Sequence, residues 1–143
     1  MDGYGNFYCT DDGNIPSLLS LPYLGAVKTD DPLYQATRRF LLSAANPYYC
    51  QGKAASGPGG PHVGIDMIWP LGVIMEGLTS TNDAKIHQCL DTLQRTHAGT
   101  GFMHEAFYKD DPKKFTRAWF AWANTIFGEL VLKTFNEHPH LLD

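Results

Sequence analysis

The stretch FTRAWFAWANTIFGELVL, residues 115–132, carries apolar side chains at helical spacing and sets the fold class that we expect for this chain. Thr116 can cap a helix that runs to about Phe135. Apolar residues cover about half of the circumference of that helix; they are Trp119, Phe120, Trp122, Ala123, Ile126, Phe127, Leu130 and Val131. A stripe this wide predicts a helix that is buried by two neighbours.

The sequence before this stretch predicts further helices. A short one is expected over residues 15–21, and a second begins after Asp31, which can cap it with Pro32 in the first position. A third begins at Pro70, and a fourth runs over about 83–97 with its apolar residues confined to one face. No run shows the sustained alternation of a strand. We therefore predict an all-α protein with elaborate loops.

The composition of the chain limits the kinds of partner that it can bind. The chain has 143 residues, with 11 lysine and arginine residues against 15 aspartate and glutamate residues, so its formal net charge is −4. An acidic chain whose basic residues cluster only at Lys113 and Lys114 cannot neutralise a row of phosphates or bind an anionic membrane through charge. No stretch approaches the roughly 18 apolar residues of a membrane span. We expect one domain that binds no nucleic acid and does not span a membrane.

The residues that commonly bind metals are scattered. Cys9, Cys50 and Cys89 form no C-x-x-C pair, so a zinc knuckle or redox motif is not indicated and free, buried thiols are expected. His104 is followed by no H-E-x-x-H or comparable partner. The sequence therefore predicts no metal site and no cofactor.

Two loop segments carry polar residues that could bind a ligand. Asp12 and Asn14 could coordinate a hard cation or hydrogen-bond sugar hydroxyls, but capping of the helix that follows is the role that local sequence favours. The loop GPGGPHVG, residues 57–64, lacks the ending of a phosphate-binding loop. Its glycines would let the backbone approach a ligand or a helix. His62 in this loop could be a placed hydrogen-bonding residue or a plain surface histidine.

Glu105 is the carboxylate with the most suggestive surroundings. It lies among apolar and aromatic residues, which is an environment that can tune a carboxyl group for acid or base catalysis. The spacing to Lys109 also allows an exposed i,i+4 ion pair, and spacing alone favours that pair. Arg117, near the expected helix start, is free to hydrogen-bond a loop or a ligand.

Long blocks of the sequence resemble the C-terminal part of glycoside hydrolase family 125, which contains metal-independent exo-α-1,6-mannosidases. In chain order they are DDGNIPSLLSLPYLG (11–25), TRRFLLSAANPYYCQG (37–52), GPGGPHVGIDMIWPLGVIMEGLTS (57–80), TGFMHEAF (100–107) and FTRAWFAWANTIFGELVL (115–132). The resemblance implies that residues 1–143 are the C-terminal portion of a glycoside hydrolase catalytic domain. It also implies the last few helices of an (α/α)6 barrel, so the expected fold is an all-α, partial barrel.

The chemistry that the resemblance implies is inverting removal of a terminal α-1,6-linked mannose from an oligosaccharide or N-glycan. Such an enzyme uses one carboxylic acid to protonate the leaving oxygen and one carboxylate to activate water. The family's general base is the glutamate of an M-H-E-S-F block and falls on Glu105. Its general acid is an aspartate upstream of the stretch that this chain matches. We therefore expect the isolated chain to be inactive or very weak.

The same resemblance assigns candidate positions around the sugar. The residues expected to line the sugar pocket are Asp12, Asn14, His62, Trp69, His104 and Arg117. Two residues depart from the family's usual pattern, because Ala106 replaces a serine and Ala118 replaces a proline. These departures remove a hydroxyl and a rigid bend near the expected pocket.

A second interpretation is a non-catalytic helical remnant that binds sugar or another chain. Twelve barrel helices of about 11 residues with connections of about 5 need on the order of 190 residues, which is more than this chain has. Helix faces that would pack inside a complete barrel should then be exposed and apolar. Exposed apolar faces of this kind predict self-association.

Overall fold

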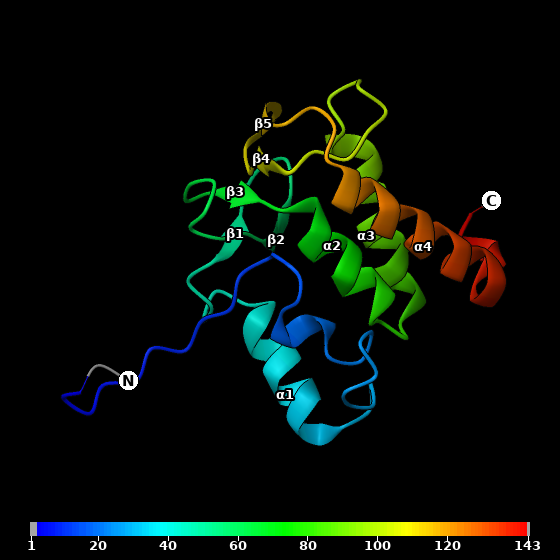
Figure 1. Ribbon diagram of the computed structural model, residues 1–143. Helices are drawn as coiled ribbons and strands as arrows, with labels where there is room; N and C mark the ends of the chain where they lie inside the picture. Colours follow the sequence, from blue (N-terminus) through cyan, green and yellow to red (C-terminus); the bar gives the residue numbers. More distant parts are fainter. Residues whose placement is uncertain (1–2, 143) are drawn as a thin grey trace.

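The computed structural model describes residues 3–142 and contains both helices and strands (Figure 1). The α-helices are α1 (Pro32–Leu41), α2 (Pro70–Leu78), α3 (Asp83–Thr96) and α4 (Ala121–Glu137). The strands are β1 (Tyr49–Gln51), β2 (Ser56–Pro58), β3 (Met67–Ile68), β4 (Ala106–Tyr108) and β5 (Asp111–Thr116). Short 3₁₀ helices lie at Leu18–Ser20 and Pro139–Leu141.

The prediction of an all-α, partial (α/α)6 barrel is wrong, because the chain is a mixed α/β structure. β1 pairs with β2, and β3, β4 and β5 form a second antiparallel sheet in that order. These strands are two to six residues long, which is too short to show a clear alternation of apolar and polar residues. The pairs β1–β2 and β4–β5 join neighbouring segments, whereas β3–β4 joins distant ones, such as Ile68 with Phe107.

Helix α2 is the centre of the fold and packs against α3 and α4 (Figure 1). It begins at Pro70 as predicted, and each of its residues is buried. Glycine allows the close approach of its neighbours. A Cβ on Gly77 would lie 3.1 Å from Leu130 Cδ1 of α4, and one on Gly72 would lie 2.7 Å from Pro58 Cβ. The helix that is buried on several sides is therefore α2, whereas the sequence predicted this for the last helix.

The predicted cap of α1 and the predicted extent of α3 are confirmed. Asp31 accepts a hydrogen bond from Tyr34 N at 2.9 Å, and Pro32 opens α1. Asn82 accepts one from Lys85 N at 3.1 Å at the start of α3, which ends within one residue of the predicted position. Both signals are local in sequence, so they could be recognised without tertiary contacts.

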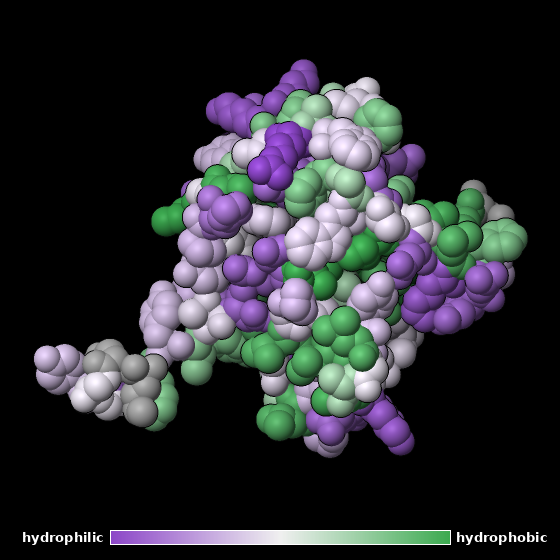
Figure 2. Space-filling view, in the orientation of Figure 1, coloured by the Kyte–Doolittle hydropathy of each residue, from purple (hydrophilic) through white to green (hydrophobic). Residues whose placement is uncertain are grey.

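The predicted start and burial of the last helix are wrong, although it ends within two residues of the predicted position. Thr116 ends β5, and α4 begins only at Ala121. Its buried residues lie on one face: Ala123, Ile126, Leu130 and Thr134. Leu132 and Phe135 are each 63% exposed, and Figure 2 shows hydrophobic groups at the surface over this helix. The helix packs mainly against α2 and also contacts the 3₁₀ helix at Pro139–Leu141, which leaves its outer face exposed.

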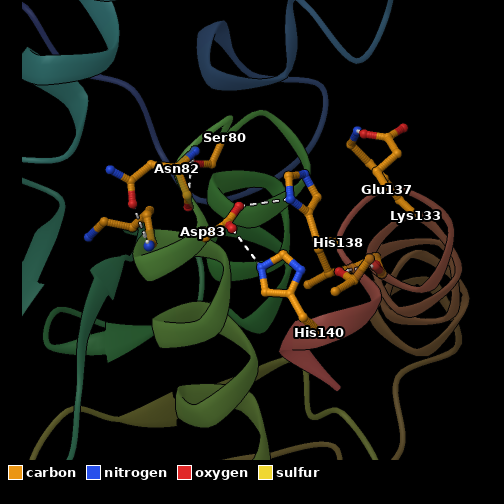
Figure 3. A network of polar contacts seen from close by, with 10 residues as sticks. Ser80, Asn82, Asp83, Lys133, Glu137, His138 and His140 are labelled. Atoms are coloured by element: carbon orange, nitrogen blue, oxygen red, sulfur yellow. Dashed lines mark hydrogen bonds and ion pairs between the residues drawn. The ribbon is translucent and has the colours of Figure 1, made fainter. Parts of the chain in front are cut away.

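A bridging carboxylate ties the end of the chain to α3 (Figure 3). Asp83 Oδ1 lies 2.7 Å from His138 Nδ1, and Asp83 Oδ2 lies 2.7 Å from His140 Nε2. The hydrogen bond from His140 is the main cause that lowers the pKa of Asp83 from its ordinary value. The 3₁₀ turn at Pro139–Leu141 is thereby held against the start of α3.

The cysteines are free thiols, as predicted, although only Cys50 and Cys89 are buried and Cys9 is exposed. Burial raises the pKa of both buried thiols. Within residues 3–142, no helix is long and apolar enough to cross a membrane.

Candidate active site

The site lies at one end of the β3–β4–β5 sheet. Ile68 pairs with Phe107, and Ala106 pairs with Thr116. Because neighbouring strands run in opposite directions, the end of β3, the start of β4 and the end of β5 meet at the same edge. This arrangement brings together the segments that contain Trp69, Glu105 and Arg117.

Glu105 is a buried carboxylate beside an exposed guanidinium. Its backbone N–H donates to Thr116 O at 3.3 Å, which fixes the residue next to β5. Oε2 lies 3.4 Å from Arg117 Nε, and the Glu105 side chain is 7% exposed against 62% for Arg117. The alternative pairing with Lys109 is wrong. Lys109 Nζ instead lies 2.7 Å from Asp66 Oδ1, and this hydrogen bond raises the pKa of Lys109.

Arg117 occupies an unusual backbone conformation. Its φ of 47° is left-handed, a region that side-chain-bearing residues seldom adopt. The residue forms the turn between the end of β5 and the approach to α4. Its guanidinium carbon lies 5.7 Å from the centre of the Phe120 ring. The turn therefore places the charge between Glu105 and an aromatic ring.

His104 is held in one orientation. Its Nδ1 lies 3.0 Å from Ala118 O, and a carbonyl oxygen can only accept, so Nδ1 carries the hydrogen. The ring stacks on Phe115 with centroids 3.9 Å apart and planes 2° from parallel. The histidine is 1% exposed, and its Nε2 has no hydrogen-bond partner among the described residues. In this tautomer Nε2 is a buried acceptor without a donor.

A second group of predicted residues packs around the start of α2. Asp12 Oδ1 accepts a hydrogen bond from Asn14 N at 2.9 Å, and Gly13 N donates to Gly59 O at 2.6 Å. A Cβ on Gly13 would lie 3.0 Å from Trp69 Cβ. Asp12 thus forms a local turn against the glycine loop and Trp69.

Neither Asp12 nor Asn14 caps the helix that follows, which corrects the favoured alternative. The N-cap residue of the 3₁₀ helix is Ser17, and Asp11 Oδ2 accepts a hydrogen bond from Leu18 N at 2.8 Å. Burial is the main cause that raises the pKa of Asp11 from its ordinary value. The polar side chains of Asp12 and Asn14 therefore have no role in capping that helix.

Trp69 is the residue of this second group that lies next to the sheet. It directly follows β3 and is the N-cap residue of α2. Its ring centre lies 6.1 Å from that of the exposed His62. Trp69 is buried, and its Nε1 has no hydrogen-bond partner among the described residues. The predicted residues thus form two clusters, one with Asp12, Asn14, His62 and Trp69 and the other with His104, Glu105 and Arg117.

Sequence reasoning missed residues that position the second cluster. Asn124 Oδ1 accepts from Met103 N at 3.0 Å, and Asn124 Nδ2 donates to Met103 O at 2.9 Å. This pair of bonds anchors α4 to the strand segment that carries His104. A single asparagine in a predicted helix gave no signal for such a contact. The stacking of Phe115 on His104 was also hidden, because Phe115 was assigned to the approach of a helix.

A cavity of about 530 Å³ lies elsewhere, between α1 and the start of α3. It is lined in part by Arg38, Arg39, Thr79 and Lys85. Arg38 is already engaged, since its guanidinium donates to Glu76 O at 2.8 Å. The cavity contains none of the predicted site residues, so we place the site by its side-chain chemistry. Among the described residues, no three histidine, cysteine, aspartate or glutamate side chains are grouped to hold a metal ion.

Known proteins are similar to this chain over most of its length. The family profile described as metal-independent alpha-mannosidase (GH125) matches residues 1–132. The meiotically up-regulated gene 157 protein of Schizosaccharomyces pombe is 51% identical over 143 residues, which is 99% of this chain and 28% of that protein.

A solved structure is also similar. It is a Streptococcus pneumoniae protein from a study of metal-independent α-mannosidases, in a non-productive substrate complex with α-1,6-mannobiose. Its TM-score is 0.90 at 48% identity, over 96% of this chain and 32% of that one. The chain therefore spans about a third or less of the length of either relative. With a family profile matched over residues 1–132, the chain belongs to glycoside hydrolase family 125, the metal-independent α-mannosidases.

Proposed function

We propose that this chain supplies the general base of an inverting exo-α-1,6-mannosidase, and that the base is Glu105. The observation that carries the proposal is the buried carboxylate of Glu105 beside Arg117 Nε at 3.4 Å, in the block that matches the family's base. The substrate is the terminal mannose of an oligosaccharide or N-glycan. The mannobiose bound to the pneumococcal relative supports this class of ligand.

In this reaction, Glu105 takes a proton from water while the water oxygen forms a bond to the anomeric carbon. The bond from that carbon to the leaving oxygen breaks, and the configuration inverts. The ion pair with Arg117 and the backbone bond to Thr116 hold the carboxylate in place. Positioning of this kind is what a general base requires.

The sugar is gripped by the predicted residues at the edge of the sheet. Asp12, Asn14 and His62 supply polar groups, and Trp69, between β3 and α2, supplies an aromatic ring. His104 and Arg117 belong to the other cluster, with Glu105. Polar and aromatic groups that converge in this way are typical of sites for small polar ligands.

The leaving oxygen also needs a proton. Family resemblance assigns the general acid to an aspartate upstream of the matched stretch, and no residue of this chain takes that role in the proposal. Loss of general acid catalysis typically lowers the rate by about 10²–10⁴-fold. We therefore expect the isolated chain to hydrolyse α-1,6-mannobiose very slowly or not at all.

α-Mannosyl fluoride separates the two roles, because fluoride leaves without being protonated. The purified chain should hydrolyse this substrate, and Glu105→Gln should lower the rate by at least about 100-fold. Glu137→Gln is the matched control, since Glu137 is an exposed carboxylate paired with Lys133 on α4. It should hydrolyse the fluoride like the unmodified chain.

Two results would contradict the proposal. One is hydrolysis of the fluoride at the same rate by the Glu105→Gln variant. The other is rapid release of mannose from α-1,6-mannobiose by the purified chain in a manner that Glu105→Gln abolishes, because that would place the acid as well as the base within it.

A further inference from the structure

The segment that contains Arg117 is longer than the segment beside it. Phe120 N donates to Met103 O at 3.1 Å, and Glu105 N donates to Thr116 O at 3.3 Å, so the two segments run in opposite directions. Residue 104 alone lies between these two contacts on one side, whereas residues 117–119 lie between them on the other. The longer segment must therefore bulge away from the shorter one.

The bulge turns its outer residues toward the surface. His104 contacts its middle residue, because Nδ1 lies 3.0 Å from Ala118 O. The Arg117 side chain is 62% exposed, and Trp119, which the sequence predicted to be buried, is 58% exposed. Extra residues on one of two paired segments commonly redirect a side chain next to a functional site. Here the bulge directs Arg117 Nε to within 3.4 Å of Glu105 Oε2.

Asn124 of α4 closes this bulge at its far end. Its Oδ1 accepts from Met103 N at 3.0 Å, and its Nδ2 donates to Met103 O at 2.9 Å and to Phe120 O at 2.8 Å. Both ends of the carboxamide are thus bonded to the backbone of the two segments. The near end is closed by the pairing of Ala106 with Thr116. Because both ends are fixed, the segment between them is held in its bulged form.

We propose that Asn124 is a positioning residue for the base, because it holds the bulge that aims Arg117 at Glu105. The proposal rests on the function proposed above and adds a residue that acts through the backbone of Met103 and Phe120. Without the carboxamide, these two segments can shift against each other and the left-handed backbone of Arg117 can relax. A displacement of about 1 Å can lower an enzymatic rate by about 100-fold.

The test follows the ion pair and the reaction separately. The Nε–H signal of Arg117 in a nitrogen-15 NMR spectrum reports the ion pair, and Glu105→Gln gives the position of that signal when the pair is lost. Asn124→Leu keeps the size of the side chain and removes its hydrogen bonds. It should move the signal most of the way to its position in Glu105→Gln. It should also lower kcat for α-mannosyl fluoride by at least about tenfold, with KM within about twofold.

Two further variants separate positioning from general stability. Asn124→Gln keeps the carboxamide and should lose less of the ion-pair signal and of kcat than Asn124→Leu. Thr134→Val is the matched control, because Thr134 is buried near the other end of α4 and its hydroxyl donates to Leu130 O at 2.8 Å. It removes a hydrogen bond from the same helix and should change neither the signal nor kcat.

An unchanged Arg117 signal with full kcat in Asn124→Leu would overturn the proposal. Equal changes in Asn124→Leu and Thr134→Val would also overturn it, because Asn124 would then contribute only to the stability of α4. If the unmodified chain did not hydrolyse the fluoride, the proposed function would fail. The NMR comparison would still decide whether Asn124 holds the ion pair.

Discussion

Arg117 Nε lies 3.4 Å from Glu105 Oε2, and Arg117 holds this position with a left-handed backbone, φ 47°. A left-handed conformation costs a residue with a side chain about 1–2 kcal/mol. Such a cost persists where the surroundings fix the backbone. Here the fixed neighbours are Thr116, which accepts from Glu105 N, and Ala118, which contacts His104. The turn thus orients the guanidinium toward the carboxylate at the expense of local stability.

This strain allows stability to be separated from function at one residue. Arg117→Gly removes both the guanidinium and the strain, whereas Arg117→Ala removes only the guanidinium. Both variants lose the ion pair, so their difference reports the strain alone, and the glycine variant should be more stable than the alanine variant by up to about 1 kcal/mol. Urea unfolding of the two variants measures the difference.

Both Arg117 variants should hydrolyse α-mannosyl fluoride at least about tenfold more slowly than the unmodified chain, because Glu105 loses the group that holds it. The account of the turn would be wrong if alanine were as stable as glycine at this position. The account of the ion pair would be wrong if either variant kept the full rate.

Two glycines should respond in opposite ways to alanine. A Cβ on Gly59 would lie 2.5 Å from Met67 O and 2.8 Å from Cys50 Sγ, inside the packed sheets. Gly59→Ala should therefore lower the free energy of unfolding by at least about 2 kcal/mol. Gly128 lies on an exposed part of α4 with nothing within 4 Å of the added atom. Gly128→Ala should raise the free energy of unfolding by about 0.5–1 kcal/mol, which thermal unfolding would detect.

Because of Asp83, the stability of the segment at residues 138–141 depends on pH in the acid range. The hydrogen bond from His140 holds the folded-state pKa of Asp83 below its ordinary value of 3.8. The stabilisation is therefore complete above pH 3.8 and is lost as the pH falls through the lower, folded-state pKa. The protection factors of the amides of residues 138, 140 and 141, which correct for the intrinsic pH dependence of hydrogen exchange, should fall over that acid range.

Asp83→Asn should remove the pH dependence of these protection factors and leave the segment weakly protected at every pH. Asp91→Asn is the control, because Asp91 lies on the same helix but pairs with Arg95. It should not alter exchange at 138–141. High protection factors that do not change with pH in the Asp83→Asn variant would show that the bridge does not hold the segment.

The exposed face of α4 predicts self-association. Leu132 and Phe135 are each 63% exposed, and apolar side chains placed together on a surface favour contact with another chain. Sedimentation velocity should show a species that grows with concentration, and the double change Leu132→Glu, Phe135→Glu should abolish it. Asn136→Glu adds a charge without removing apolar area, so it should still associate. A chain that stays monomeric at all concentrations would contradict this expectation.

The helices could be predicted from sequence where the signal was local. Asp31 with Pro32, and Pro70 at the start of α2, act within one turn of their helices. The strands could not, because most are only two or three residues long and show no clear alternation, and because the pair Ile68 and Phe107 joins segments that are far apart in sequence. Residues 116–120 had aromatic side chains at helical spacing, yet the backbone turns at Arg117 and the helix starts later.

The candidate site likewise contains a residue that the sequence identified and contacts that it did not. Glu105 was identified by family resemblance, while spacing alone favoured its neighbour Lys109 as the partner. The observed partner, Arg117, is brought close by the pairing of β4 with β5, and Lys109 is drawn to Asp66 instead. A tertiary contact of this kind leaves no periodic trace in the sequence. The exposure of Trp119 was hidden for the same reason.

The anomeric configuration of the first product tests the central claim most directly. The purified chain is supplied with α-mannosyl fluoride, and the mannose that forms is followed by proton NMR before it mutarotates. The account predicts that β-mannose appears first, because water activated by Glu105 attacks the face opposite the departing fluoride, and that Glu105→Gln suppresses its formation. Initial formation of α-mannose, or formation of β-mannose at an unchanged rate by Glu105→Gln, would contradict it.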